Sequence, residues 1–311
     1  MAIAAHFLDE HRHFLWGLCY RMTGNAADAE DIVQDTFARA LEKPPANTRA
    51  PWRPWLAKVA MNLSRDRLRR RRRQQYFGPW LPSPVIADDH DQLAIDPAAA
   101  SEHSPVARYE LMESITLAFL VALEALTPAQ RAVLLLRDVF DYSTLETAET
   151  LDMTENNVKV TLHRARQIME AYDKRRVWHL SERADQLQVT LQRFLSKLAA
   201  GDVESLKQML AADVVLVTDG GGEINALDEP VFGRDKVLRL IEKLYEAYRG
   251  VTSTLVQIVN GEPAILIYRG QVKPRHASFF TMHCELNEGL QMQRLHFVFA
   301  PSKLSALPKR Q

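Results

Sequence analysis

Hydrophobic positions recur with two different periods along this chain, and the change of period divides it into two parts. Up to about residue 175, apolar residues recur every three or four positions, which predicts helices over residues 5–73 and 111–175. Beyond residue 180, two amphipathic helices precede strand-like runs, with one further helix at 235–248. The strand-like runs cover 214–218, 251–259, 264–268, 278–286 and 290–299. We therefore predict two all-helical domains followed by an α+β domain with a curved antiparallel sheet.

The second predicted helix, residues 28–41, carries an acidic outer face. Its apolar residues have the spacing of a core-facing stripe: Ile32, Val33, Phe37 and Leu41. The polar residues between them, Asp31, Gln34 and Asp35, are then expected on the outside. An exposed acidic helix face suits a basic partner protein.

A dense basic segment ends the third predicted helix. Between Arg65 and Arg73 the chain has seven arginines and one acid, too many for one helix face, so we expect most to face solvent. Such a density suits contacts with phosphate groups. Trp52 and Trp55 lie just upstream, and aromatic residues among cations suit single-stranded DNA, because bases stack on the rings. We expect Trp55 in the core, whereas Trp52 fits a core or an exposed position equally well.

Residues 144–169 have the pattern of a helix-turn-helix motif. A short helix at 144–151 is followed by the turn Asp152-Met153, and Thr154 is the expected N-cap of a second helix. The apolar stripe of that helix is Val158, Leu162, Ala165 and Met169. Its polar residues include Asn156, Asn157, Lys159, His163 and Arg166. Exposed amides can read base edges and cations can meet phosphates, although an ordinary helical hairpin with a solvated face has the same pattern.

Composition narrows the function classes. The chain has 311 residues, of which 47% are hydrophobic and 25% charged, as in folded proteins, and its formal net charge is zero. Its two cysteines fall in different predicted domains, which argues against a disulfide framework, and no apolar run is long enough to cross a membrane. No metal-ligand spacing and no cofactor motif is present. These features favour a cytoplasmic protein that has no membrane-spanning segment and no membrane as a partner.

Four segments, in this order, resemble RNA polymerase sigma factors of the extracytoplasmic-function (ECF) group of the sigma-70 family. They are residues 28–41 (DAEDIVQDTFARAL), 55–69 (WLAKVAMNLSRDRLR), 126–137 (LTPAQRAVLLLR) and 158–166 (VKVTLHRAR). The resemblance covers about the first 175 residues. It implies sigma region 2 at residues 1–75, a linker at 76–110 and sigma region 4 at 111–178. It also implies the function of an alternative sigma factor, which binds core RNA polymerase and recognises and opens promoter DNA.

The same resemblance implies a role for each surface. The acidic face of Asp31, Gln34 and Asp35 would dock on the β′ clamp of core RNA polymerase, and the β flap would be a second contact. The opened −10 element would meet Trp52, Asn62, Arg65, Asp66 and Arg69, with the loop at 48–52 capturing a flipped base. The −35 element, as double-stranded DNA, would meet Asn156, Asn157, Lys159, His163 and Arg166.

Residues 181–303 resemble the SnoaL-like members of the NTF2-like cone fold, which a subgroup of these sigma factors carries. The matching segments are 213–222 (DVVLVTDGGG), 231–234 (VFGR), 301–304 (PSKL) and the linker island 80–84 (WLPSP). Two segments depart from the family: Ser83 replaces an acid, and residues 300–302 read Ala-Pro-Ser in place of Asn-Pro-Asp. The resemblance implies a regulatory contact made by Trp80, Leu81, Pro82, Asp219, Gly220, Gly221, Gly222, Lys303 and Leu304.

Several alternatives stay open for the third domain. The glycines at 220–222 permit positive φ and close backbone approach, so they fit either a tight turn or a seat for the linker peptide. In enzymes of the cone fold a pocket holds a catalytic acid or base, for which Asp219, His283 and His296 are the candidates here, although we expect no catalytic residue. A small ligand or a protein could bind this domain. The rival functions are a helix-turn-helix regulator and a cone-fold enzyme fused to a DNA-binding module.

Overall fold

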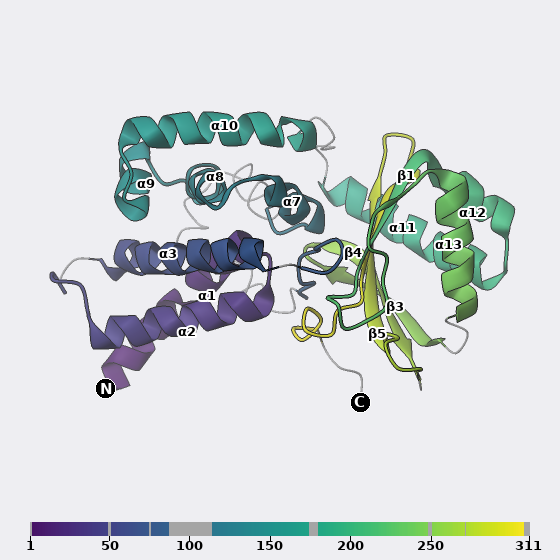
Figure 1. Ribbon diagram of the computed structural model, residues 1–311, viewed down its shortest axis with the longest axis horizontal. Coiled ribbons are helices and arrows are strands. Elements are labelled where there is room, and N and C mark those ends of the chain that lie inside the picture. The colour runs from purple at the N-terminus through teal and green to yellow at the C-terminus, as the bar shows by residue number, and fades with distance from the viewer. Residues whose placement is uncertain are drawn as a thin grey trace. The chain divides into compact units, whose positions relative to one another are not determined.

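The computed structural model describes residues 2–48, 51–74, 76–86, 114–173, 180–247, 251–270 and 272–307. The chain forms two compact units (Figure 1). Unit 1 comprises Met1–Gln75 and Ala87–Lys174, and unit 2 comprises Tyr76–Ile86 and Arg175–Gln311. Residues 76–86 of the predicted linker therefore belong to the same unit as the third predicted domain. The rest of that linker lies outside the described residues.

Unit 1 is helical throughout its described part. Its helices are α1 (Ala2–Thr23), α2 (Ala26–Glu42), α3 (Trp52–Arg73), α7 (Leu117–Ala122), α8 (Pro128–Leu134), α9 (Thr144–Leu151) and α10 (Glu155–Asp173). A 3₁₀ turn at Leu123–Ala125 and a π-helical turn at Leu135–Val139 complete the set. Helices α1, α2 and α3 pack against one another, α10 packs on α8 and α9, and α3 contacts α8 and α9.

Local capping explains where several of these helices begin. Gly24 takes a positive φ of 64°, which ends α1, and the Asn25 side chain accepts a hydrogen bond from the Asp28 N–H at 3.0 Å to start α2. Thr127 and Ser143 form capping boxes at the starts of α8 and α9. The helix starts near these residues follow from short-range hydrogen bonds that the sequence itself encodes.

Two predictions about packing in the first helices are wrong. Leu41 is 63% exposed, because it lies beyond Ala40, the last buried residue of α2, and Phe37 is only half-buried. Trp55 is half-buried, since the inward stripe of α3 runs through Leu56, Ala57 and Ala60. Its ring packs edge-on against Trp52, with centroids 6.2 Å apart.

Unit 2 is a six-stranded sheet with helices packed on one face (Figure 1). Its helices are α11 (Leu180–Ala199), α12 (Val203–Met209) and α13 (Arg234–Ala247). Its strands are β1 (Leu210–Asp219), β2 (Val231–Phe232), β3 (Val251–Val259), β4 (Glu262–Arg269), β5 (Phe279–Leu286) and β6 (Met292–Val298). The strand order is β2-β1-β6-β5-β4-β3.

The sheet is mixed, so the prediction of a purely antiparallel sheet is wrong at one pair. Strand β1 pairs with β6 in parallel, whereas β2 pairs with β1, and β3 to β6 with one another, in the antiparallel sense. A parallel pair requires a long crossover connection, and here most of the domain lies between the two strands. The alternation of side chains within a strand carries no information about the direction of its neighbour.

Alternation along the strands places one set of apolar residues against the helices. Met282, Leu295 and Phe297 belong to the core that also contains Leu191 and Phe194 of α11. Neighbouring residues of β5 and β6 point to the opposite face of the sheet. Strands β3 and β4 are joined by an Asn260-Gly261 turn in which both φ values are positive, 54° and 74°. This is the two-residue hairpin turn that Asn-Gly favours.

Within the described part of the chain, no helix is long and apolar enough to cross a membrane. The same residues contain no cluster of three or more His, Cys, Asp or Glu side chains placed to hold a metal ion.

Candidate polymerase and promoter surfaces and the linker clamp

Helix α2 presents the acidic face that its sequence predicts. Asp31, Gln34 and Asp35 are all exposed. Arg67 of α3 lies beside this face, 3.3 Å from a carboxylate oxygen of Asp31, and Gln34 donates a hydrogen bond to Glu30 at 2.9 Å. The face is therefore acidic at its surface and partly neutralised along the edge next to α3.

The residues predicted for the −10 element lie along α3. Asn62 and Arg65 are half-buried, whereas Asp66 and Arg69 are exposed and form an ion pair at 3.0 Å. Trp52 opens the helix, and its indole N–H donates to the Thr48 carbonyl at 3.2 Å. Two residues of the predicted base-capturing loop, 49 and 50, lie outside the described residues.

The C-terminal end of α9 binds two cations of α3, a contact that the sequence did not indicate. Lys58 donates to the Glu149 carbonyl at 3.1 Å and pairs with the Asp152 carboxylate. Arg65 donates to the Leu151 carbonyl at 3.4 Å. The last carbonyls of a helix carry partial negative charge and attract cations, so α9 occupies part of the basic surface of α3.

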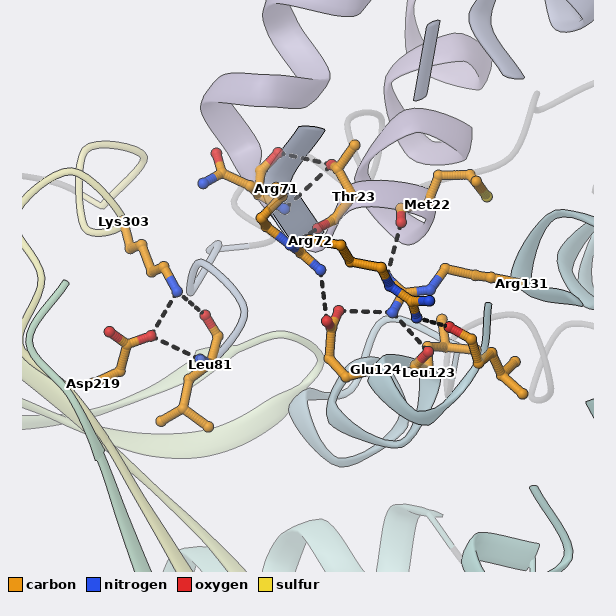
Figure 2. A network of polar contacts seen from close by, with 12 residues as sticks. Met22, Thr23, Arg71, Arg72, Leu81, Leu123, Glu124, Arg131, Asp219 and Lys303 are labelled. Carbon is orange, nitrogen blue, oxygen red and sulfur yellow. Dashed lines mark hydrogen bonds and ion pairs between the residues drawn. The ribbon is translucent and has the colours of Figure 1, made fainter. Parts of the chain in front are cut away.

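Most arginines at the end of this segment are exposed, as the sequence predicts, and Arg71 is an exception. Arg71 is half-buried and donates to the Thr23 carbonyl at 2.7 Å and to Glu124 at 2.5 Å (Figure 2). Glu124 also pairs at 2.7 Å with Arg131 of α8, which is almost fully buried. Arg131 donates to the carbonyls of Met22 and Leu123 at 2.9 and 2.6 Å. These arginines join α1, α3 and α8 to one another and to the 3₁₀ turn that follows α7.

The helix-turn-helix geometry is confirmed for α9 and α10. Asp152 takes a left-handed conformation with φ 53°, and the Thr154 hydroxyl accepts from the Asn157 N–H at 3.2 Å. The predicted stripe of Val158, Leu162, Ala165 and Met169 is buried. The polar residues Asn156, Asn157, Lys159, His163 and Arg166 are all exposed. Arg166 is engaged by Asp138 at 2.7 Å, so a phosphate would have to compete with that carboxylate.

In unit 2, a buried ion pair holds the linker island. The Lys303 ammonium lies 2.5 Å from Asp219 Oδ2 and donates to the Leu81 carbonyl at 2.5 Å (Figure 2). The same Asp219 oxygen accepts from the Leu81 N–H at 2.7 Å. Asp219 is 0% exposed and Lys303 is 3% exposed. We call this arrangement, together with Tyr76 and Trp80, the linker clamp.

Two aromatic residues complete the linker clamp. The Tyr76 hydroxyl donates to Asp219 Oδ1 at 2.6 Å. The Lys303 ammonium lies 4.1 Å from the Trp80 ring centroid and 4.7 Å from that of Tyr76, within range of cation–π attraction. A buried charge pair is tolerated only when further hydrogen bonds satisfy both groups, and the linker supplies most of them here.

The glycines after β1 serve both roles that the sequence left open. Glu223 N–H donates to the Gly220 carbonyl at 3.0 Å, which closes a tight turn, and a Cβ on Gly220 would lie 2.2 Å from the Ile224 carbonyl oxygen. Gly221 N–H donates to Asp219 Oδ1 at 3.0 Å. A Cβ on Gly222 would lie 3.6 Å from Phe77 of the linker, so these residues also seat the linker. Pro82 and Leu304 are buried alongside.

Sequence reasoning missed Asn260 and Tyr76 as contributors to the contact between the linker and the rest of unit 2. The backbone N–H of Asn260 donates to the Val85 carbonyl at 2.8 Å, and its side-chain oxygen accepts from Val85 N–H at 3.2 Å. Ile86 then forms an isolated antiparallel bridge with Val259. The Asn-Gly pair indicated a hairpin turn, but no local pattern shows that this turn also binds the linker, and none indicates Tyr76.

The catalytic candidates of the cone fold are placed apart from the helix-covered face of the sheet. Asp219 belongs to the linker clamp. His283 and His296 pair across β5 and β6 next to Met282 and Phe297, and alternation turns them to the opposite face. Burial, with a further contribution from His296, lowers the pKa of His283 to about 3, so this imidazole is neutral at pH 7.

The comparisons with known proteins agree with this architecture. Residues 7–74 match the family model "Sigma-70 region 2", and residues 116–169 match "Sigma-70, region 4". The ECF RNA polymerase sigma factor SigJ of Mycobacterium tuberculosis is 34% identical over 256 residues, which cover 81% of this chain and 77% of SigJ. This chain belongs to the ECF RNA polymerase sigma factors. The probable ECF sigma factor SigI of the same organism is 29% identical, over 96% of this chain and 93% of SigI.

The likeness also extends through unit 2. The crystal structure of SigJ matches with a TM-score of 0.71 and 26% identity, covering 98% of this chain and 99% of SigJ. The predicted fold class is confirmed: helical sigma regions 2 and 4 followed by an α+β, SnoaL-like domain. As an ECF sigma factor the protein binds core RNA polymerase and promoter DNA to initiate transcription, and sigma factors are not a class of enzymes.

Proposed function

We propose that unit 2 regulates this ECF sigma factor by holding residues 76–86 in the linker clamp. The supporting observation is that Asp219 and Lys303 bind both the N–H and the carbonyl of Leu81. This segment lies between regions 2 and 4 in the sequence. Its anchoring leaves residues 87–113 as the remaining connection between the two regions. A shorter connection raises the effective concentration of one region near the other.

A shorter connection between regions 2 and 4 would favour the contact between α9 and α3. Lys58 and Arg65 hold carbonyls of α9 in this structure, and we propose that the same cations meet promoter phosphates. Release of residues 76–86 from the linker clamp lengthens the connection between regions 2 and 4, and it thereby weakens the contact of α9 with Lys58 and Arg65. Loop-closure entropy alone predicts a gain of about twofold in the fraction of exposed α3. A ligand or partner that prefers one linker state would shift this equilibrium by its differential affinity.

The test compares the wild-type protein with an Asp219→Ala/Lys303→Met double variant, which removes both charges of the clamp and leaves neither unpaired. Hydrogen exchange of residues 76–86 reports whether the linker is released. Transcription in vitro with core polymerase should then rise by about twofold. Lys236→Met, an exposed lysine of α13, is the control and should change neither readout. A released linker with unaltered transcription would contradict the proposal.

For the polymerase contact, we propose that Asp31, Gln34 and Asp35 dock on the β′ clamp and that region 4 contacts the β flap. Exposed carboxylates on α2 support the first assignment. An Asp31→Arg/Asp35→Arg variant should lose co-elution with core polymerase in size-exclusion chromatography. The control, Asp228→Arg/Glu229→Arg, makes the same charge change on exposed residues of unit 2 and should co-elute normally. Retained co-elution of the α2 variant would place the docking face elsewhere.

For the promoter, we propose that the exposed face of α10 reads the −35 element and that α3, with Trp52, Asn62, Arg65, Asp66 and Arg69, contacts the −10 element. Asn156→Ala should remove about 1–3 kcal/mol of discrimination at one base pair. Lys159→Ala should weaken binding to all sequences and reduce its salt dependence. Gln167→Ala, exposed further along α10, serves as control. Equal effects of all three variants would argue against base reading by this face.

A further inference from the structure

Unit 2 contains a cavity of about 300 Å³ between its helices and the sheet. Its inner part is lined by Phe194 of α11 and by residues of three strands: Ile265, Ile267, Phe280, Met282 and Phe297. Its outer part is lined by Leu198 and Tyr245 from α11 and α13 and by Thr254 of β3. Thr254 and Tyr245 are exposed, so the cavity opens to solvent on their side.

The size of this cavity distinguishes it from an ordinary packing defect. Protein interiors seldom keep voids much larger than a water molecule, because unfilled space forfeits dispersion contacts. The volume lies at the lower end of the range of small-molecule sites, roughly 300–1,000 Å³. Water would find few partners on the inner wall, and apolar cavities of even about half this volume bind apolar ligands.

The residues that line the cavity indicate which kind of ligand it can bind. None of the lining side chains carries a charge at neutral pH, and the hydroxyls of Thr254 and Tyr245 are the polar side-chain groups among them. A charged ligand would lose its hydration without gaining a partner on the inner wall. His283 and His296 are not among the lining residues, so the cavity has no imidazole for acid–base chemistry. The arrangement suits binding and not turnover.

We propose that this cavity is a binding site for an uncharged, largely apolar small molecule, with any hydroxyl or carbonyl of the ligand at the mouth beside Thr254 and Tyr245. Phe280 and Phe297, whose ring centroids are 6.5 Å apart, offer aromatic surface to the ligand. The site is separate from the linker clamp, and its existence does not depend on the proposed regulation by the linker.

The test uses two fluorescent probes that differ mainly by one charged group. N-phenyl-1-naphthylamine is uncharged, and 1-anilinonaphthalene-8-sulfonate carries a sulfonate. Titration of the full chain should show saturable, one-to-one binding of the uncharged probe and at least about tenfold weaker binding of the sulfonated one, because the inner wall cannot compensate a charge. No saturable binding of the uncharged probe, or equal binding of both, would overturn the proposal.

A pair of variants locates the site. Thr254→Trp fills the mouth and should weaken binding of the uncharged probe about tenfold, as overpacking of a formed site does. Leu255→Trp, the next residue of β3, is half exposed and does not line the cavity, so it should leave binding unchanged. Equal losses in both variants would place the probe elsewhere. If Thr254→Trp lowers the melting temperature, Leu198→Trp at the α11 side of the mouth gives the same readout. Because these assays contain neither polymerase nor DNA, their failure would not affect the proposed function.

Discussion

Each unit contains a buried cation that binds a carboxylate and at least one main-chain carbonyl (Figure 2). The two sites differ in the solvent exposure of the carboxylate. In unit 1, Glu124 is 28% exposed and is shared by Arg71 and Arg131. In unit 2, Asp219 is fully buried, and Lys303 is its one ion-pair partner among the described residues. Loss of Arg131 leaves the Glu124 carboxylate partly exposed and paired with Arg71. Loss of Asp219 leaves the Lys303 ammonium buried without a carboxylate.

The contrast between the two sites agrees with the rule that a buried ion pair is stable only when further hydrogen bonds satisfy both groups. The linker clamp makes the linker one of those partners, because Leu81 and Tyr76 donate hydrogen bonds to Asp219 and the Leu81 carbonyl accepts one from Lys303. In unit 1, Glu124 has two cationic partners, so loss of one arginine leaves the carboxylate paired with the other. We therefore expect that loss of one member of the linker clamp weakens the binding of all the others.

The largest effect is expected from Asp219→Ala. The remaining Lys303 charge would be buried without a carboxylate, which costs about 3–5 kcal/mol of the free energy of unfolding of unit 2. Urea denaturation followed by hydrogen exchange within residues 210–304 measures this loss. The Asp219→Ala/Lys303→Met double variant should recover most of it, since no lone charge remains. If Asp219→Ala lowers the free energy of unfolding by less than about 1 kcal/mol, the proposed difference between the two sites is wrong.

A smaller loss is expected from Arg131→Met. The carbonyls of Met22 and Leu123 would lose a donor, while Glu124 keeps Arg71, so unit 1 should lose about 1–3 kcal/mol. Urea denaturation monitored by hydrogen exchange of α1 and α8 gives the value. The isosteric Glu124→Gln change should cost less than Arg131→Met. A loss above that of Asp219→Ala would reverse the comparison.

Acid should affect unit 2 through its buried histidines. The pKa of folded His283 is lowered to about 3, below the ordinary value of 6.5, and burial lowers that of His296 as well. The folded state therefore favours the neutral imidazole, and the stabilisation present above pH 6.5 is lost as the pH falls towards 3. At pH 5 the loss from His283 is about 2 kcal/mol. His283→Gln should flatten the dependence of the unfolding midpoint between pH 7 and 5. An unaltered slope would mean that other groups dominate.

The smallest change in stability is expected from Lys58→Ala. Its ion pair with Asp152 is exposed on both sides, and such pairs contribute at most about 1 kcal/mol. Hydrogen exchange at the end of α9 should nevertheless rise, because the Glu149 carbonyl also loses its donor. Lys159→Ala, at an exposed residue of α10, is the matched control for stability. A loss of several kcal/mol on Lys58→Ala would show that α9 and α3 form one rigid core.

The amino-acid sequence alone predicts the helices, most strands and the exposed polar faces of α2 and α10. The stripe of Val158, Leu162 and Ala165 and the acidic positions Asp31 and Asp35 follow from the period of a helix, which any local segment displays. Resemblance to the sigma family also selected Asp219 and Lys303 as members of one regulatory contact. Neither kind of reasoning indicated which atoms these residues bind.

The pairings between distant segments became evident only in the folded chain. The parallel pairing of β1 with β6, the contact of α9 with Lys58 and Arg65, and the hydrogen bonds between Val85 and Asn260 all join residues far apart in the sequence. A local pattern reports which side of an element is apolar. It does not report what packs against that side, because the free energy of a long-range contact depends on burial and hydrogen-bond partners that exist only after the chain has folded.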